Sequence, residues 1–212
     1  SRFFANISHE FRTPLTLILS PLEEKLNNDL PQKDKIVFQS MKRSANRLLD
    51  LINQLLELSK LESGFMKLKN QPGNIYNFMV PVISAFDSLA DVSHVNFSRE
   101  ISLPEANVMF DPDKLEKIVN NLLSNAFRFS PRGERVEIKV VSAPVGSFVR
   151  LTIKVKNTGT VIPPEILNKI FEPFFQGSAP VVSGIPGTGL GLSLVRELVR
   201  LYGGEITVTS TK

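Results

Sequence analysis

Two stretches in the N-terminal third of the chain place apolar residues at the three- and four-residue steps of an α-helix. The first runs from Phe4 to Leu26 and ends near Asn27, and the second follows a polar break at 29–32 and runs from Phe38 to Leu55. The spacing predicts an antiparallel helical hairpin. Further leucines widen the apolar stripe of the second helix beyond what one partner helix covers. Two copies packed as a four-helix bundle would cover it, so we expect a homodimer.

The pattern changes after residue 62, where Ser63-Gly64 and Gln71-Pro72-Gly73 mark a linker. Beyond it, the periodicity predicts helices over about 74–91, 112–128 and 164–170 and a helix ending at Tyr202, with strands over 95–103, 136–141, 148–156 and 205–209. The residues 143–146 are expected to join two of these strands. This order predicts an α+β chain: the hairpin, residues 1–66, followed by an α/β sandwich with a mixed sheet, residues 67–212.

Composition removes several classes of protein. The 212 residues are 42% hydrophobic and 22% charged, which is typical of a globular chain. There is no cysteine and there are two histidines, so disulfides, thiolate metal sites, cysteine nucleophiles and multi-histidine metal centres are excluded. The net charge of +4 comes without a basic run, so we expect no nucleic-acid partner. The apolar runs are far shorter than the roughly 20 residues that span a bilayer.

One histidine has neighbours that point to chemistry. A helical wheel places His9 about 145° from the centre of the first apolar stripe, so we expect it to face solvent. Glu10 adjoins it, Thr13 lies one turn later on the same face, and Pro14 removes a helical amide and predicts a kink. An exposed imidazole beside a carboxylate has a nucleophilic nitrogen and a group that can take its proton.

Two further segments suggest a phosphate ligand. Asn121 and Asn125 lie on one edge of a predicted helix, and Arg128 follows one turn later. These side chains either bind a phosphate ligand and Mg²⁺ or are capping or solvent-exposed polar residues without a ligand. The run Gly187-Thr188-Gly189-Leu190-Gly191 precedes a helix, where bare glycines let backbone amides approach a phosphate. A plain turn is the alternative for this run.

The segment 4–16 closely resembles the H box of sensor histidine kinases. In that family the histidine accepts the γ-phosphoryl group of ATP, the following acid acts as acid/base, and the threonine positions water for dephosphorylating a response regulator. The resemblance assigns these roles to His9, Glu10 and Thr13. It also supports the dimeric bundle.

Further resemblances cover residues 3 to 208. Residues 113–131 resemble the N box of the histidine-kinase and GHKL ATPase superfamily, 170–176 the F box and 187–193 the second glycine box, with 177–186 as a short ATP lid. The resemblance implies Mg²⁺ bound by Asn125. It implies ATP contacts from Asn121, Asn125, Arg128, Phe129, Asn157, Gly159, Ile162, Gly187, Thr188, Gly189, Leu190 and Gly191.

The first glycine box departs from the family pattern. Asn157 stands where the family has the aspartate that accepts from the adenine amine, and Val161 stands where it has a glycine. A neutral acceptor is worth about 1 kcal/mol less than a charged one, so we expect ATP to bind up to about tenfold more weakly. The alternative is a weakened pseudokinase, phosphatase or dimerisation module that signals by conformation.

The resemblance also implies partners and a location. We expect a homodimer that passes phosphate to the receiver domain of a response regulator. We expect the cytoplasmic portion of a membrane-anchored bacterial sensor, the chain itself lying outside the membrane. The family continues past residue 212 into one more strand, so we expect a truncated C-terminus.

Overall fold

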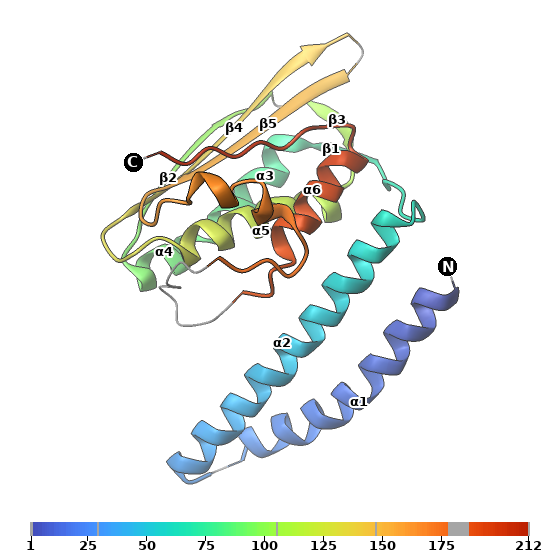
Figure 1. Ribbon diagram of the computed structural model, residues 1–212, viewed down its shortest axis with the longest axis vertical. Coiled ribbons are helices and arrows are strands. Elements are labelled where there is room, and N and C mark those ends of the chain that lie inside the picture. The colour runs from blue at the N-terminus through green and yellow to red at the C-terminus, as the bar shows by residue number, and fades with distance from the viewer. Residues whose placement is uncertain (1, 29, 105, 147, 178–186, 212) are drawn as a thin grey trace. The chain divides into compact units, whose positions relative to one another are not determined.

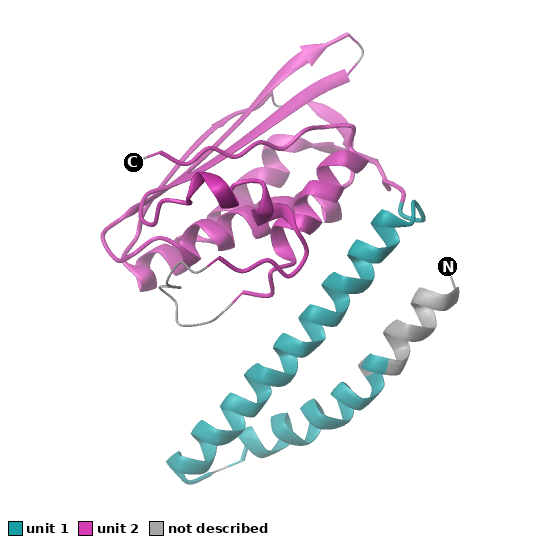
Figure 2. Ribbon diagram, in the orientation of Figure 1, with its two compact units in different colours: residues 1–66 teal, residues 67–212 magenta. Residues whose placement is uncertain are grey.

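A computed structural model describes residues 2–28, 30–104, 106–146, 148–177 and 187–211, with the side chains of 2–10 and 12 outside the described set. The chain divides into two compact units, Ser1–Met66 and Lys67–Lys212, coloured separately in Figure 2.

The first unit is a pair of helices, α1 (Arg2–Leu26) and α2 (Gln32–Glu62), which lie side by side and run in opposite directions (Figure 1). Pro14 and Pro21 lie inside α1, and the helix continues through both while its ribbon bends, as expected where proline removes a backbone donor. Lys42 Nζ lies 2.9 Å from Glu23 Oε1 and links the two helices. The predicted helical hairpin is therefore confirmed.

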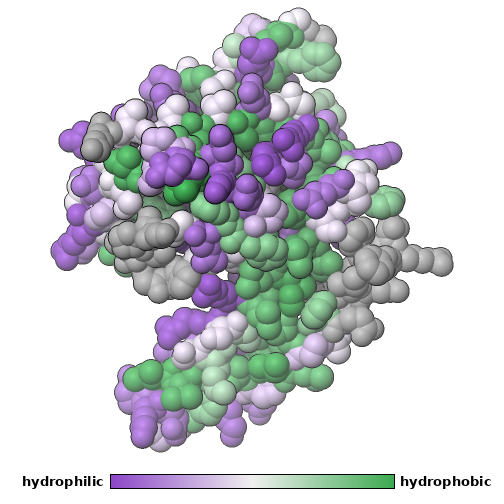
Figure 3. Space-filling view, in the orientation of Figure 1, coloured by the Kyte–Doolittle hydropathy of each residue, from purple (hydrophilic) through white to green (hydrophobic). Residues whose placement is uncertain are grey.

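The hairpin buries only part of its apolar surface. Leu15, Leu22 and Ala45 are buried, whereas half or more of each of several other large apolar side chains is exposed, and apolar patches lie over the hairpin in Figure 3. The exposed set with 50% or more accessible surface is Phe11, Leu17, Ile18, Ile36, Val37, Met41 and, after the second helix, Phe65. An apolar surface of this extent is typical of a helix face that packs against a further partner.

The second unit is built on a three-stranded sheet of order β2-β4-β5, formed by β2 (Asn96–Ser102), β4 (Arg135–Val145) and β5 (Phe148–Asn157). Strands β2 and β4 are parallel and β4 and β5 antiparallel, which confirms the predicted mixed sheet. Val136, Ile138 and Val140 of β4 are fully buried, and their neighbours in the strand are more exposed, so one face of the sheet carries the core.

Helices cover that face: α3 (Ile75–Ser84), α4 (Asp87–Ser93), α5 (Pro112–Arg128) and α6 (Gly191–Leu201) (Figure 1). The central helix α5 begins where the sequence signals it, because Asp111 caps it and Pro112 occupies its first turn. Its buried residues, among them Val119, Leu123 and Phe127, pack into the core beneath β4. This packing fixes α5, which carries the predicted asparagines.

Several expected elements differ in the structure. The helix expected over 74–91 is two helices, and the break brings Phe86 into stacked contact with Phe127, with ring centroids 5.8 Å apart. The predicted linker ends earlier, because β1 (Gln71–Asn74) pairs with β3 (Asn107–Phe110) in a second, two-stranded sheet. The segment 164–170 forms two single turns of 3₁₀-helix, Pro164–Ile166 and Lys169–Phe171, in place of a helix.

Two predicted strand limits are also wrong. Three of the four residues expected to join β4 and β5, 143–145, belong to the ladder, which continues to the pair Val145↔Phe148. Pro144 is tolerated there because β2 pairs with β4 only as far as Val141, so Pro144 lies at an edge. Residues 205–209 alternate in exposure but pair with none of the described strands, and so they are extended chain without the ladder that defines a strand.

Candidate functional site

The predicted phosphoacceptor segment lies in α1, which includes His9 and Glu10 in its helical backbone. The side chains of both residues lie outside the described set, so the expected solvent-facing imidazole stays a prediction. Thr13, one helical turn after His9, is exposed.

The two asparagines of α5 project from one edge of a helix whose other face is buried in the core. Asn121 Nδ2 donates to the Lys117 carbonyl over 2.8 Å, which fixes the amide and turns its Oδ1 away from the helix. Asn125 Oδ1 accepts from Arg128 Nη1 over 3.3 Å. Both asparagines are partly exposed. The two amides and the guanidinium therefore form one polar edge along the last two turns of α5.

The glycine run 187–191 lies against this edge, and a side chain at either point of contact would displace a polar side chain of α5. A Cβ built on Gly191 would lie 2.7 Å from Asn121 Oδ1 and 3.7 Å from Asn125 Nδ2. A Cβ on Gly187 would overlap the Arg128 guanidinium. The structure thus brings together two predicted segments whose contacting residues are 59 to 70 positions apart in the sequence. Helix α6 begins at Gly191, so its N-terminal backbone amides, which favour an anion, lie beside the asparagines.

The conformation of the glycine run is held by the segment that resembles the F box. Phe174 N donates to the Gly189 carbonyl over 2.9 Å, and Gln176 Nε2 donates to the Gly187 carbonyl over 3.1 Å. Gly189 has φ +75°, and a Cβ there would meet the Phe174 backbone at 2.7 Å. Thr188 Oγ1 accepts from Leu190 N over 3.2 Å, and Leu190 is fully buried. The expected lid, 177–186, lies outside the described residues except for residue 177.

The departing first glycine box lies at the end of β5. Asn157 is the last residue of that strand and is exposed. Gly159 has φ +135°, and a Cβ there would lie 2.7 Å from the carbonyl oxygen of Phe129, the residue that directly follows α5. Ile162 is partly buried, and its N–H donates to Ser210 Oγ over 2.9 Å. Because Gly159 has no side chain, the first glycine box packs closely against the C-terminal end of α5, the helix that the glycine run 187–191 also contacts.

Sequence reasoning missed the residues that hold these segments in place. Thr158 Oγ1 donates to Glu134 and accepts from the Arg135 N–H over 2.9 Å, which ties the first glycine box to the loop before β4. Glu134 carries no sequence signal, because it lies 24 residues from Thr158. Phe174 and Gln176 lie within the F-box segment that the sequence did single out.

The candidate site offers a metal ion few negatively charged ligands. Among the described residues, no group of three histidine, aspartate or glutamate side chains is placed to hold an ion. An octahedral Mg²⁺ that keeps several waters and binds phosphate oxygens needs only one or two protein oxygens. The side-chain oxygens of Asn121 and Asn125 fit that modest requirement, and they lie beside the backbone at the start of α6.

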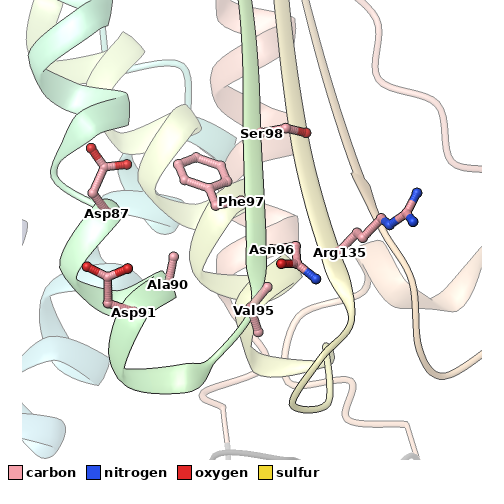
Figure 4. Close-up of a pocket in the computed structure, with 8 residues that line it drawn as sticks. All are labelled: Asp87, Ala90, Asp91, Val95, Asn96, Phe97, Ser98 and Arg135. Atoms are coloured by element: carbon pink, nitrogen blue, oxygen red, sulfur yellow. The ribbon is translucent and has the colours of Figure 1, made fainter.

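A cavity of about 550 Å³ lies elsewhere in the second unit, between α4 and β2 (Figure 4). Asp87 and Asp91 of α4 line one side of it, and Arg135 of β4 lies on the other. None of the predicted site residues lines this cavity. Within the described residues, no helix is long and apolar enough to cross a membrane.

Comparison with protein families matches both units. Residues 1–64 match the model of the His Kinase A (phospho-acceptor) domain, and residues 110–212 match that of the histidine kinase-, DNA gyrase B-, and HSP90-like ATPase. The two matches occur in the order that the sequence predicts.

Individual proteins agree with these family matches. Histidine kinase P4 of Formosa agariphila is 36% identical over 210 residues, which is 97% of this chain and 15% of that protein. Hybrid signal transduction histidine kinase D of Dictyostelium discoideum is 36% identical over 98% of this chain and 14% of its own length. The chain thus spans about a seventh of the length of these two relatives.

A solved structure shares the fold of both units. The crystal structure of full-length ShkA in complex with AMPPNP has a TM-score of 0.78 and 26% identity, covering 95% of this chain and 41% of that one. The structure of the histidine kinase ThkA in complex with the response regulator protein TrrA has a TM-score of 0.59 and 25% identity, covering 96% of this chain and 55% of that one. With both units matched in sequence and in fold, this chain belongs to the sensor histidine kinases of two-component signalling and comprises a phosphoacceptor hairpin and a GHKL-type ATPase unit.

Proposed function

We propose that residues 67–212 bind Mg-ATP and transfer its γ-phosphoryl group to His9 in the hairpin, residues 1–66. An imidazole nitrogen attacks the γ-phosphorus, so a P–N bond forms while the bond from phosphorus to the β,γ-bridging oxygen breaks and ADP leaves. Glu10, next in the chain, takes the imidazole proton. This proposal rests on one juxtaposition above all, the polar edge of α5 lying against the glycine run 187–191.

Each side of that juxtaposition has a role in holding the nucleotide. Arg128 and the backbone amides at the start of α6 bind phosphate oxygens. Asn125 Oδ1, with Asn121 beside it, is the protein ligand of Mg²⁺, which neutralises charge on the phosphates when bound. Asn157, Gly159 and Ile162 contact the base, together with Phe129. The ShkA structure, which holds AMPPNP, supports a nucleotide in this fold.

The hairpin supplies the acceptor and the partner surface. Its exposed apolar face supports a homodimer in which two hairpins form a four-helix bundle. From His9 the phosphoryl group passes to an aspartate of a response-regulator receiver domain. Thr13 positions a water molecule that hydrolyses the aspartyl phosphate and releases inorganic phosphate. The ThkA–TrrA complex supports such a partner. We place the chain in the cytoplasmic portion of a membrane-anchored sensor.

A second candidate function has one observation in its favour. Asn157 and Val161, which replace the usual aspartate and glycine, are both exposed where the base would bind. If they abolish nucleotide binding, the chain is a pseudokinase that signals by conformation or acts as a phosphatase.

Incubation of the full chain with γ-labelled ATP and Mg²⁺ separates these functions. The kinase becomes labelled, and the label is lost in acid because phosphohistidine is acid-labile. Asn125→Ala removes the proposed Mg²⁺ ligand and should abolish labelling, whereas Asn53→Ala, an exposed asparagine of α2, is the matched control and should label as the parent does. Absence of label in the parent, together with no ATP binding at millimolar concentration, would establish the pseudokinase instead.

A further inference from the structure

Asp111, the residue before α5, is almost completely buried, with 3% of its surface exposed. Both oxygens of its carboxylate accept backbone hydrogen bonds. Oδ1 accepts from Lys114 N over 3.1 Å and caps α5. Oδ2 accepts from Lys69 N over 2.7 Å, across 42 residues of sequence. The shorter of the two bonds is therefore the one that joins α5 to the segment by which the chain enters the second unit.

The backbone of Asp111 is tied to α6 in the same way. Tyr202, which ends α6, donates its hydroxyl hydrogen to the Asp111 carbonyl over 2.8 Å and accepts from the Asp111 N–H over 3.2 Å. Burial of the phenol raises the pKa of Tyr202 to about 12, so the hydroxyl keeps its proton at neutral pH. One residue thus joins the entering segment, the start of α5 and the end of α6.

These two helices carry the proposed nucleotide site. Asn121, Asn125 and Arg128 lie in the second half of α5, and Gly191 begins α6. A helix is stiff over so few turns, so a shift of the Asp111 junction moves the site residues with it. The entering segment, 67–70, directly follows the hairpin and its short connection.

The chemistry of Asp111 exceeds what a helix cap requires. Asparagine and serine cap helices about as well as aspartate, and neither needs a carboxylate to be buried. Only a carboxylate offers acceptor oxygens to the Lys114 and Lys69 amides at once. An asparagine that caps α5 through Oδ1 turns its NH₂ toward the Lys69 N–H, which places a donor against a donor.

We propose that Asp111 is a positioning residue for phosphoryl transfer: through Lys69 it fixes the segment leaving the hairpin to the helices that hold the nucleotide. The inference rests on the proposed kinase function. Loss of the Asp111–Lys69 bond leaves α5 capped and the nucleotide contacts in place. It releases the segment that connects the hairpin to the second unit, so the rate of transfer falls while nucleotide affinity is kept.

The test uses the full chain and removes the Asp111–Lys69 hydrogen bond either at its acceptor or at its donor. Asp111→Asn keeps the cap and loses the bond to Lys69. Lys69→Pro removes the N–H donor, and its matched control, Lys69→Ala, keeps the N–H and changes only an exposed side chain. Autophosphorylation at saturating Mg-ATP, the calorimetric Kd for Mg-ATP and the thermal midpoint are measured for each variant and for the double variant.

The expected result is a rate lowered about fivefold or more in Asp111→Asn and in Lys69→Pro, a Kd within about twofold of the parent, and parental behaviour in Lys69→Ala. The double variant should be no slower than the slower single variant, because both changes remove the same bond. A parental rate in Asp111→Asn, or a rate and a Kd that worsen by the same factor, would overturn the inference. A parent that takes no label would overturn the proposed function and this inference with it.

Discussion

Replacement of Gly191 by alanine tests how closely the glycine run and the asparagine edge of α5 are fitted. The added Cβ lies 2.7 Å from Asn121 Oδ1, and real Cβ contacts are ordinary only from 3.4 Å outward. Asn121 must therefore move by about 0.7 Å. It is not free to do so without cost, because its Nδ2 is bonded to the Lys117 carbonyl over 2.8 Å.

The change has opposite effects on folding and on ligand binding. Alanine is the better helix former by about 1 kcal/mol in a helix interior, so Gly191→Ala at the start of α6 should leave the thermal midpoint unchanged or slightly raised. A displacement of about 1 Å at a site costs up to roughly a hundredfold in function, so about 0.7 Å predicts a loss of about tenfold in Mg-ATP affinity, or about 1.4 kcal/mol.

Calorimetric titration with Mg-ATP measures this loss. Asn53→Ala, at an exposed asparagine of α2, is the control and should bind Mg-ATP as the parent does. In the double variant Gly191→Ala/Asn121→Ala the clash is gone, so it should bind as Asn121→Ala alone does. Parental Mg-ATP affinity in Gly191→Ala would refute the idea that nucleotide binding depends on the close packing of these two segments.

Three further predictions follow from other parts of the molecule. Tyr202→Phe should lower the free energy of unfolding by about 1–3 kcal/mol, because the buried Asp111 N–H loses its acceptor. The pKa of Tyr202 is raised from 10.0 to about 12 in the folded state, so the parent should lose the stability that this phenol contributes as the pH rises from 10.0 toward 12. Urea titrations at several pH values would show this loss in the parent and not in Tyr202→Phe. Asn157→Asp should lower the calorimetric Kd for Mg-ATP about two- to tenfold, and an unchanged Kd would show that residue 157 does not bind the base. The fragment 1–66 should sediment as a dimer at micromolar concentration, and a monomer would contradict the four-helix bundle.

The sequence predicted those elements whose signals are local. Helix α5 is an example, because a capping aspartate, a proline in the first turn and an apolar period of three and four all agree. The strands β1 and β3 could not be predicted, since four residues containing Pro72-Gly73 are typical of a linker and become a strand only by pairing across the chain. The break after Ser84 has the same origin, because it depends on Phe86 reaching Phe127.

The candidate site divides in the same way. Asn121, Asn125 and the glycine run are recognisable as motifs, and the structure brings them into contact. The long-range bonds that hold the site are not recognisable, because they join residues far apart in the sequence, such as Thr158 with Glu134 and Asp111 with Lys69. Ordinary residues acquire such roles only in the fold.

Peptide mapping tests most directly whether His9 receives the phosphoryl group of ATP. Trypsin cuts after Arg2 and Arg12, so it releases a peptide of residues 3–12 in which His9 is the only histidine and Ser8 the only hydroxyl side chain. After incubation with Mg-ATP and digestion at neutral pH, mass spectrometry should find one phosphate on this peptide, with fragment ions that place it on His9. The phosphate should be lost in acid and be absent from His9→Gln. Phosphate on Ser8, or on another peptide of a chain whose 3–12 peptide stays unmodified, would contradict the claim.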